Sequence, residues 1–357
     1  MKNCPSIISF LLWLFCYAAM MGQEQKLWHD QARKIHYAPE NKSFVLQNGE
    51  RKFNRALYGT NTGFRVEAGD LPEFAMYMPG MGGNLKLGII TKSKQSKWIT
   101  TADSIYAKYT PGTMEYVIQD KFLEKGSLKL QVVALAKSEG FILKIVTRNI
   151  SSDVSIIWAY GGASGKKFSR NGDIGGDPES VFYLKPEYCI NNEFSVEKNS
   201  FILEYGSENN KQKTGNNKKI QGIFPDSKVH VASAFELDNP FECMVSKGDS
   251  LPVLFGKFKN ISLKPSYILL ENNEGNKKLS QEELATLFIK GLDTVNAIAN
   301  RINIKTPDPY LNTLGGVLAT AADGIWEDPA YLHGAVAWRM HLNAWRGAYA
   351  ADPLGWH

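Results

Sequence analysis

The segment Met114-Glu115-Tyr116-Val117-Ile118-Gln119 alternates apolar and polar side chains, and Leu128-Lys129-Leu130-Gln131-Val132 repeats the alternation shortly afterwards. A period of two is typical of a strand with one face in a core. The run Phe141-Ile142-Leu143-Lys144-Ile145-Val146 is more continuously apolar, as in a strand buried on both faces. A further inward row is formed by Val154, Ile156, Trp158 and Tyr160. These patterns predict several short strands around one core.

Turn signals separate such segments over residues 44–270, for example Pro111-Gly112, Lys125-Gly126 and Glu139-Gly140. Many short strands without intervening helical patterns indicate a β-sandwich. We therefore expect a mainly β protein with a large antiparallel sandwich.

The hydrophobic period changes after residue 278. Ser280 and Glu283 fit a capping box, and apolar residues from Leu284 to Ile302 recur at helical spacing. A second helix is predicted over about 309–325, with Leu311, Leu314, Leu318, Ala321 and Ala322 on one side, and a third over about 332–350. We expect these three helices to be the only ones, all at the C-terminal end.

The N-terminus has the pattern of a secretory signal. Lys2 precedes an apolar run over residues 7–15, and small residues follow up to Gly22. The run is shorter than the roughly 20 residues of a membrane span. We expect residues 1–22 to be a signal peptide, with the mature protein periplasmic or secreted and without a membrane span.

Composition excludes several other classes. Of 357 residues, 43% are hydrophobic and 22% charged, which is typical of a globular protein rather than a disordered one. The 41 basic and 36 acidic residues leave a net charge of only +5, which gives no case for nucleic acid. No Cys or His spacing resembles a metal site, and no cofactor is expected. A disulfide between Cys189 and Cys243 is left open by the sequence.

Weaker signals occur in the β region. Residues 79–84 are glycine-rich but lack the lysine of a phosphate loop, so a turn is predicted there. Residues 161–167 and 171–177 miss the spacings of a nucleotide loop and of a calcium loop. Glu67, Asp70 and Glu73 are predicted to form a solvated edge.

The last 32 residues hold four of the eight tryptophans and three of the six histidines. Trp338, His341, Trp345 and Tyr349 form one stripe of the third predicted helix, beside Arg339 and Arg346. Aromatic faces stack on sugar rings, and Arg, His and carboxylates bond to the surrounding hydroxyls. A core role is the alternative for Trp345 and Tyr349, but a core rarely needs His, Arg, Glu and Asp in one short stretch. The cluster predicts a carbohydrate-binding site.

Two sets of motifs resemble known families. Ala322-Asp323-Gly324-Ile325-Trp326, residues 333–339, Trp345-Arg346-Gly347 and residues 354–357 resemble the opening helices of six-hairpin glycosidases. Those enzymes have an (α/α)6 barrel after a β-supersandwich and a linker helix. Residues 52–74, from Lys52-Phe53-Asn54-Arg55 to Pro72-Glu73-Phe74, resemble a family of exported Bacteroidetes proteins of uncharacterised function that share this layout and are thought to act on polysaccharides.

The resemblance implies a β-supersandwich over residues 23–274, a linker helix over 275–305 and the start of the barrel over 306–357. Such a barrel needs six helical hairpins, and residues 306–357 are sufficient for about one. The resemblance implies a set of substrate-binding residues: Trp326, His333, Trp338, Arg339, Trp345 and Arg346.

Glu327 is the candidate catalytic acid, and Asp323, Asp328 and Asp352 are the other carboxylates nearby. For Asp323 and Asp328 the alternative is a structural carboxylate at a helix end or a turn.

The function expected is an exported glycoside hydrolase-like protein, or the N-terminal part of one that is inactive alone. The alternative is a non-catalytic carbohydrate-binding or assembly protein. A lyase is disfavoured because its toroid usually precedes the supersandwich. A sugar phosphorylase is disfavoured because the chain is predicted to be exported.

Overall fold

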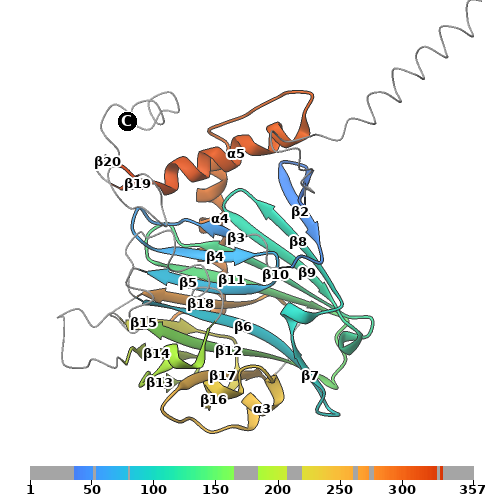
Figure 1. Ribbon diagram of the computed structural model, residues 1–357, viewed down its shortest axis with the longest axis vertical. Coiled ribbons are helices and arrows are strands. Elements are labelled where there is room, and N and C mark those ends of the chain that lie inside the picture. Colours follow the sequence, from blue (N-terminus) through green and yellow to red (C-terminus); the bar gives the residue numbers. More distant parts are fainter. Residues whose placement is uncertain are drawn as a thin grey trace, which may run out of the picture. The chain divides into compact units, whose positions relative to one another are not determined.

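The computed structural model describes residues 36–50, 54–78, 81–164, 184–206, 219–259, 264–272, 277–327 and 330–332. The chain divides into two compact units, Met1–Tyr37 and Ala38–His357, and the architecture given below is that of the second unit. Its described residues lie mainly in two large antiparallel sheets (Figure 1). The prediction of a mainly β sandwich with a few helices is confirmed.

The first sheet has ten strands in the order β1-β2-β8-β9-β10-β11-β18-β15-β14-β13. Its strands are β1 (Ala38–Glu40), β2 (Ser43–Gln47), β8 (Ser104–Thr110), β9 (Thr113–Gln119), β10 (Ser127–Ala134), β11 (Gly140–Arg148), β18 (Ser266–Asn272), β15 (Lys219–Ile223), β14 (Ser200–Glu204) and β13 (Glu193–Glu197). The predicted alternation is present, since Met114, Tyr116 and Ile118 are fully buried. The run in β11 is buried on both faces only at Phe141, Ile142 and Leu143, after which exposure alternates.

The second sheet has eight strands in the order β16-β17-β12-β6-β5-β4-β3, with β7 paired to β6. Its strands are β16 (Ser227–Ser233), β17 (Pro252–Phe258), β12 (Val154–Ser164), β6 (Met81–Thr91), β5 (Glu73–Met78), β4 (Arg65–Gly69), β3 (Asn54–Leu57) and β7 (Ser96–Trp98). The turn predicted over residues 79–84 is wrong for Met81 to Asn84, which pair with β12 in β6. Two adjacent glycines resembled a turn, although here they lie within a long, buried strand.

Aromatic side chains fill the space between the two sheets. Phe74 of β5 and Tyr116 of β9 meet edge to face with ring centroids 5.9 Å apart, and the Tyr116 hydroxyl donates to the Gly69 carbonyl at 2.7 Å. Farther along, Trp158 of β12 packs on Phe224 at 4.9 Å and on Phe201 of β14 at 6.5 Å. Such rings bury large apolar areas and are a main source of stability in the core.

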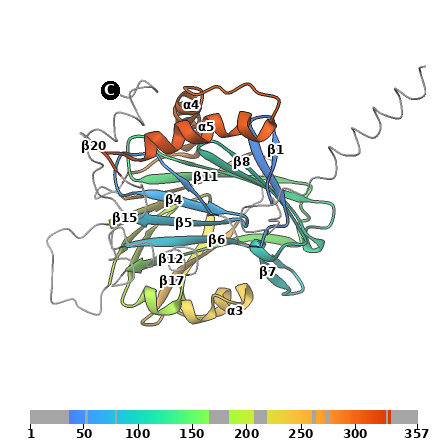
Figure 2. The ribbon, with the colours of Figure 1, turned by 45° about the horizontal axis from the view of Figure 1, so that its top comes forward.

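Helix α4 (Gln281–Ala299) covers the outer face of the ten-stranded sheet (Figure 2). The expected capping box is present, because Glu283 N donates to the Ser280 hydroxyl and Ser280 N donates to the Glu283 carboxylate. The buried side chains of α4, including Leu284, Phe288 and Val295, pack on residues of β10, β11 and β18. Each such side chain contributes about 1.5–3 kcal/mol by leaving water.

Helix α5 (Pro309–Gly324) follows α4 and packs against it and against β1. Its buried positions are small, namely Thr313, Gly315, Ala319, Thr320 and Gly324. A Cβ on Gly315 would lie 3.1 Å from the Ile302 carbonyl oxygen, so the helix approaches its neighbour closely at this point.

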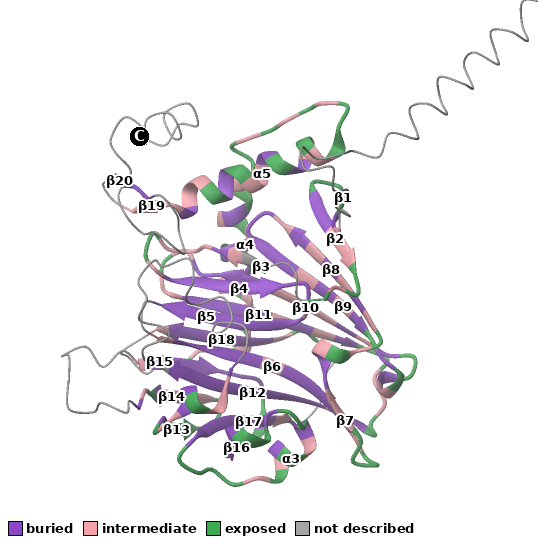
Figure 3. Ribbon diagram, viewed as in Figure 1, coloured by how far each residue is buried: buried purple, intermediate pink, exposed green. Residues whose placement is uncertain are grey.

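The leucines of α5 point away from the sandwich. Leu311, Leu314 and Leu318 are 46%, 36% and 53% exposed, and we call them the α5 leucine face. Figure 3 shows this mixed exposure along α5 above strands that are buried over most of their length. The leucines therefore share one side of the helix, as predicted, but the buried side is the one with the small residues.

The prediction of no helix between the strands is wrong. Helix α3 (Pro240–Val245) lies between β16 and β17, begins at the cap Asn239 and has Pro240 in its first turn. At six residues it is too short to show a helical period in the sequence. Phe241 and Met244 of α3 pack on an apolar cluster outside the eight-stranded sheet that includes both Cys189 and Cys243.

The two cysteines are buried and free, so the disulfide that the sequence left open is not formed in this structure. Burial raises the pKa of each thiol to about 12. Neither thiol is therefore a reactive thiolate at neutral pH. Among the described residues, no helix is long and apolar enough to cross a membrane.

Candidate functional site

Trp326 and Glu327 lie directly after α5, in the short strand β19 (Trp326–Glu327). This strand pairs with β20 (Ala330–Tyr331), with Trp326 opposite Tyr331 and Glu327 opposite Ala330. The rings of Trp326 and Tyr331 are 4.8 Å apart and tilted by 57°. Leu332 N donates to the Ile325 carbonyl at 2.9 Å, which closes this element onto the end of α5. The indole and the Glu327 side chain are each half-buried.

The loop between β3 and β4 holds the end of α5 in place. Asn61 Nδ2 donates to the carbonyl oxygens of Asp323 and Trp326, both at 3.1 Å. A Cβ on Gly324 would lie only 2.4 Å from the Tyr58 ring, so α5 ends against that ring at a position that requires glycine. We call this set of contacts the junction, made by Tyr58, Asn61, Asp323, Gly324 and Trp326. It joins the two motif regions that carried the family resemblances.

Charged residues of the sandwich lie close to the junction. Burial, with a smaller contribution from the negative charge of Glu67 and against the opposing charge of Arg65, raises the pKa of Tyr58 to about 12. Arg65 and Glu67 are on strand β4, immediately after the loop that carries Tyr58 and Asn61. The junction therefore continues into the outer face of the eight-stranded sheet.

Four ionisable residues on that face are buried or nearly so, and we call them the ion row: Arg65, Glu67, Glu73 and Lys86. Arg65 pairs with Glu67, and Lys86 Nζ lies 3.6 Å from Glu73 Oε1. The Arg65 guanidinium also lies 3.6 Å from the centroid of the Tyr77 ring, a cation–π contact across β4 and β5. Among the described residues, Arg65 Nη1 and Glu67 Oε2 have no hydrogen-bond partner.

The prediction that Glu67, Asp70 and Glu73 form a solvated edge is wrong. Their exposed fractions are 3%, 2% and 3%. In a strand, residues two apart share a face, so Arg65 and Glu67 point the same way. Charges on a strand usually mark its solvent side, but here both faces of β4 and β5 are covered. Buried charges of this kind need partners, and Glu67 has Arg65 while Glu73 has Lys86.

The remaining predicted site residues lie outside the described residues. These are His333, Trp338, Arg339, Trp345 and Arg346, with the carboxylates Asp328 and Asp352. The structure thus brings together Trp326, Glu327 and Asp323 and gives no position for the rest. Asp323 lies in the last turn of α5, and its carbonyl takes part in the junction.

Sequence reasoning missed Tyr58, Asn61, Arg65 and Lys86 as neighbours of this region. Tyr58 and Asn61 stood in a motif that carried a resemblance, although nothing in the motif assigned them a role. A signal for the ion row was available in the sequence. Arg65 and Glu67 are two residues apart, which places them on one face of a strand, and Glu73 and Lys86 lie opposite each other on the next two strands.

The described residues contain no group of three or more His, Cys, Asp or Glu side chains placed to hold a metal ion. The segment from the end of α5 to β20 presents the Trp326–Tyr331 ring pair and two carboxylate residues, Asp323 and Glu327.

The fold and the junction define an antiparallel two-sheet β-sandwich protein with helices packed on its outer side. The chain belongs to the family described as Domain of unknown function (DUF4450), whose model matches residues 78–291, more than half of the chain. No curated protein matches the chain.

Two glycoside hydrolases are among the similar solved structures. A bacterial glucoamylase in complex with acarbose gives a TM-score of 0.45 at 11% identity, over 79% of this chain and 44% of that one. A family GH92 inverting mannosidase from Bacteroides thetaiotaomicron VPI-5482 gives a TM-score of 0.42 at 9% identity, over 80% and 36%. The chain therefore spans less than half the length of either structure.

Proposed function

We propose that the chain is an exported glycoside hydrolase-like protein, or the N-terminal part of one, acting on polysaccharide or oligosaccharide. The observation that carries the proposal is the junction, where Asn61 of the sandwich loop binds the Trp326 carbonyl. The Trp326 ring packs on Tyr331, and Glu327 is the next residue of the same strand. An aromatic face can stack on a sugar ring, and a carboxylate beside it can accept hydrogen bonds from the hydroxyls of that ring. The signal-like N-terminus and the aromatic, His and Arg cluster of the sequence support the same function.

The proposal includes a helical domain that begins with α5. The α5 leucine face presents Leu311, Leu314 and Leu318 at i, i+3 and i+7, the spacing of a helix that packs on another helix. Exposed apolar stripes of this kind mark contact surfaces. In this proposal residues 23–274 are the sandwich domain, residues 275–305 the linker helix, and the segment from residue 306 the start of an (α/α)6 barrel.

Glycoside hydrolysis uses two carboxyl groups, one of which protonates the leaving oxygen. Glu327 is the candidate acid in this proposal, and Trp326 is the candidate platform for the sugar. Within the barrel, the substrate-binding roles would extend to His333, Trp338, Arg339, Trp345 and Arg346.

The test is release of reducing sugar from a panel of plant and host polysaccharides by the protein expressed from its whole gene. We expect Glu327→Gln to lower turnover by about 100-fold or more, the typical contribution of a general acid. Trp326→Ala should weaken substrate binding, and Phe235→Ala is the control because this ring is 65% exposed and outside the junction. Binding without release would support the non-catalytic carbohydrate-binding alternative. If the protein neither binds nor cleaves any polysaccharide of the panel, both functions are contradicted.

A further inference from the structure

A groove of about 470 Å³ lies between strand β7 and the segment that joins η4 (Ala234–Glu236) to α3. Strand β7 and helix α3, which contribute lining residues, lie on the opposite side of the sheets from α5 (Figures 1 and 2). The residues that line the groove include Lys94, Lys97, Trp98, Asp238, Asn239 and Phe241. Its volume falls in the range of about 300–1,000 Å³ that is typical of ligand pockets.

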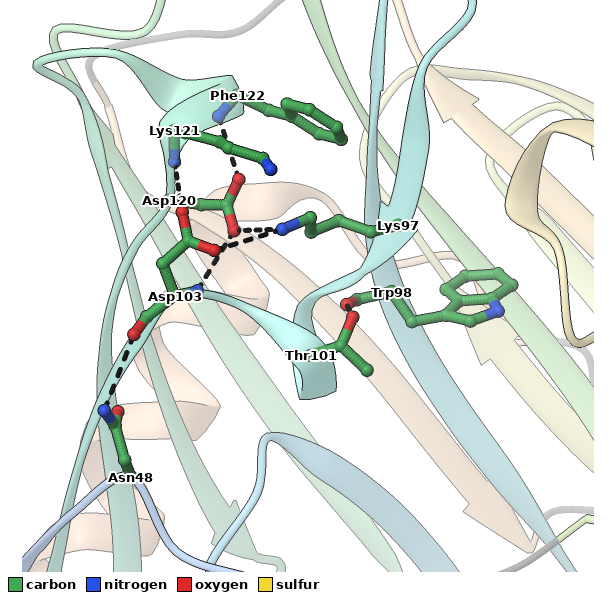
Figure 4. A network of polar contacts seen from close by, with 8 residues as sticks. All are labelled: Asn48, Lys97, Trp98, Thr101, Asp103, Asp120, Lys121 and Phe122. Carbon is green, nitrogen blue, oxygen red and sulfur yellow. Dashed lines mark hydrogen bonds and ion pairs between the residues drawn. The ribbon is translucent and has the colours of Figure 1, made fainter.

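One wall of the groove is fixed by a network around Lys97 (Figure 4). Lys97 Nζ donates to Asp120 Oδ2 at 2.7 Å and to Asp103 Oδ1 at 3.3 Å, and the Asp120 side chain is fully buried. Burial alone would lower the pKa of Lys97, but its bonds to Asp120 and Asp103 outweigh that effect and raise the pKa. The ammonium group is thus charged and held in one place, with the Phe122 ring 4.9 Å from it.

The other wall is fixed by Asn239. Its Oδ1 accepts hydrogen bonds from Phe241 N at 3.0 Å and from the Ser96 hydroxyl at 3.3 Å, and these bonds tie α3 to β7. Trp98 Nε1 donates to the Leu237 carbonyl at 2.6 Å, so the indole holds the two walls together. Both sides are therefore ordered before a ligand arrives, which lowers the entropy cost of binding.

The lining combines an aromatic ring with polar groups of both signs. Phe241 is half-buried, while Lys94, Asp238 and Asn239 are exposed around it. Asp238 and Glu242 would repel a polyanion, and Lys94 and Lys97 would repel a polycation. A ligand whose groups both donate and accept hydrogen bonds, and which has an apolar face for the ring, avoids both conflicts.

We propose that this groove, the α3 groove, is a second saccharide site that binds a neutral oligosaccharide through Phe241 and the polar groups around it. The choice of saccharide rests on the proposed function, but the site is separate from the junction. It would hold a glycan chain on the sandwich without taking part in hydrolysis.

The test is calorimetric titration of the full 357-residue chain with four neutral hexasaccharides, made of glucose in α- and β-linkage, mannose and xylose, and with an oligogalacturonate. We expect at least one neutral sugar to bind, and Phe241→Ala to weaken that binding about tenfold. Asp238→Ala, a change at an exposed residue that leaves the fold intact, should weaken it several-fold. Phe235→Ala is the matched control, an aromatic of neighbouring η4 outside the groove, and should bind as the unmodified chain does.

Trp326→Ala in the same titration separates this site from the junction. Retained binding by Trp326→Ala together with loss in Phe241→Ala supports the α3 groove. Loss in Trp326→Ala with full binding in Phe241→Ala and Asp238→Ala overturns the α3 groove while leaving the proposed function in place. No binding to any neutral sugar, or preference for the oligogalacturonate, also overturns it.

Discussion

Helices α4 and α5 follow one another and have similar lengths, yet they use their apolar residues in opposite ways. In α4, Leu284 and Phe288 are 0% and 1% exposed because they pack on the ten-stranded sheet. In α5, the large apolar residues of the leucine face are exposed and the buried residues are small. Hydrophobic periodicity thus shows that a helix has an apolar side, but not which partner that side meets.

The difference separates two roles for neighbouring helices. Helix α4 belongs to the sandwich, since its removal would uncover Val133, Ile142 and Leu269. Helix α5 is held by its buried small residues and by the junction, and its leucine face is exposed. In the proposed function the rest of a helical domain packs on that face.

The largest expected effect comes from truncating one apolar side chain in each helix. Phe288→Ala should lower the free energy of unfolding by about 3–5 kcal/mol, because it leaves a cavity against the sheet. Leu314→Ala should change it by no more than about 0.5 kcal/mol, as for a surface residue. Urea unfolding followed by circular dichroism measures both. A similar loss in the two variants would show that the leucine face is covered in this chain.

The helix caps test the same contrast with a smaller change. Ser280→Ala removes the capping box of α4 and should cost about 1 kcal/mol. Asp308 caps α5 by accepting Tyr310 N at 2.8 Å, but α5 covers less of the core, so Asp308→Ala should cost less in the same urea experiment. Ser280→Thr keeps the hydroxyl and serves as the control. A larger loss at Asp308 would contradict the assignment of α4, rather than α5, to the sandwich.

The last effect appears only at alkaline pH and concerns the attachment of α5 to the sandwich through Tyr58. An unfolded tyrosine ionises near pH 10, whereas burial holds the pKa of Tyr58 at about 12. The stabilisation is therefore complete below pH 10 and is lost as the pH rises from 10 to 12. Tyr58→Phe cannot ionise and should retain more of its stability in that range. Thermal melting between pH 9 and 12 would show this, and identical alkaline losses in both proteins would count against a buried Tyr58.

Much of the fold could be predicted from local pattern. Alternation in β9 and β10, the turn dipeptides and the Ser280 capping box depend on neighbouring residues, and each is present in the structure. The burial of Glu67 and Glu73 could not be predicted in this way, because it depends on what covers β4 and β5. Helix α3 was missed because six residues are too few to establish a period.

For the candidate site, the sequence identified Trp326 and Glu327 but not what holds them. The bonds from Asn61 to Asp323 and Trp326 span 262 and 265 positions of the chain. No single-sequence period or spacing reports a contact at that separation. The two family resemblances included the residues on each side of the junction, in segments 52–74 and 322–326. They did not indicate that these two segments are in contact.

The pairing order of the strands also constrains how the protein is made. In one sheet β11 pairs with β18, and in the other β12 pairs with β17, so each joins an early strand to one beyond residue 250. During synthesis from the N-terminus, β11 and β12 therefore emerge with one edge open until the late strands arrive. Open edges recruit other strands, so a chaperone, or rapid completion of the chain, is needed to keep nascent copies apart. Truncation before residue 250 should give aggregates rather than a smaller folded sandwich.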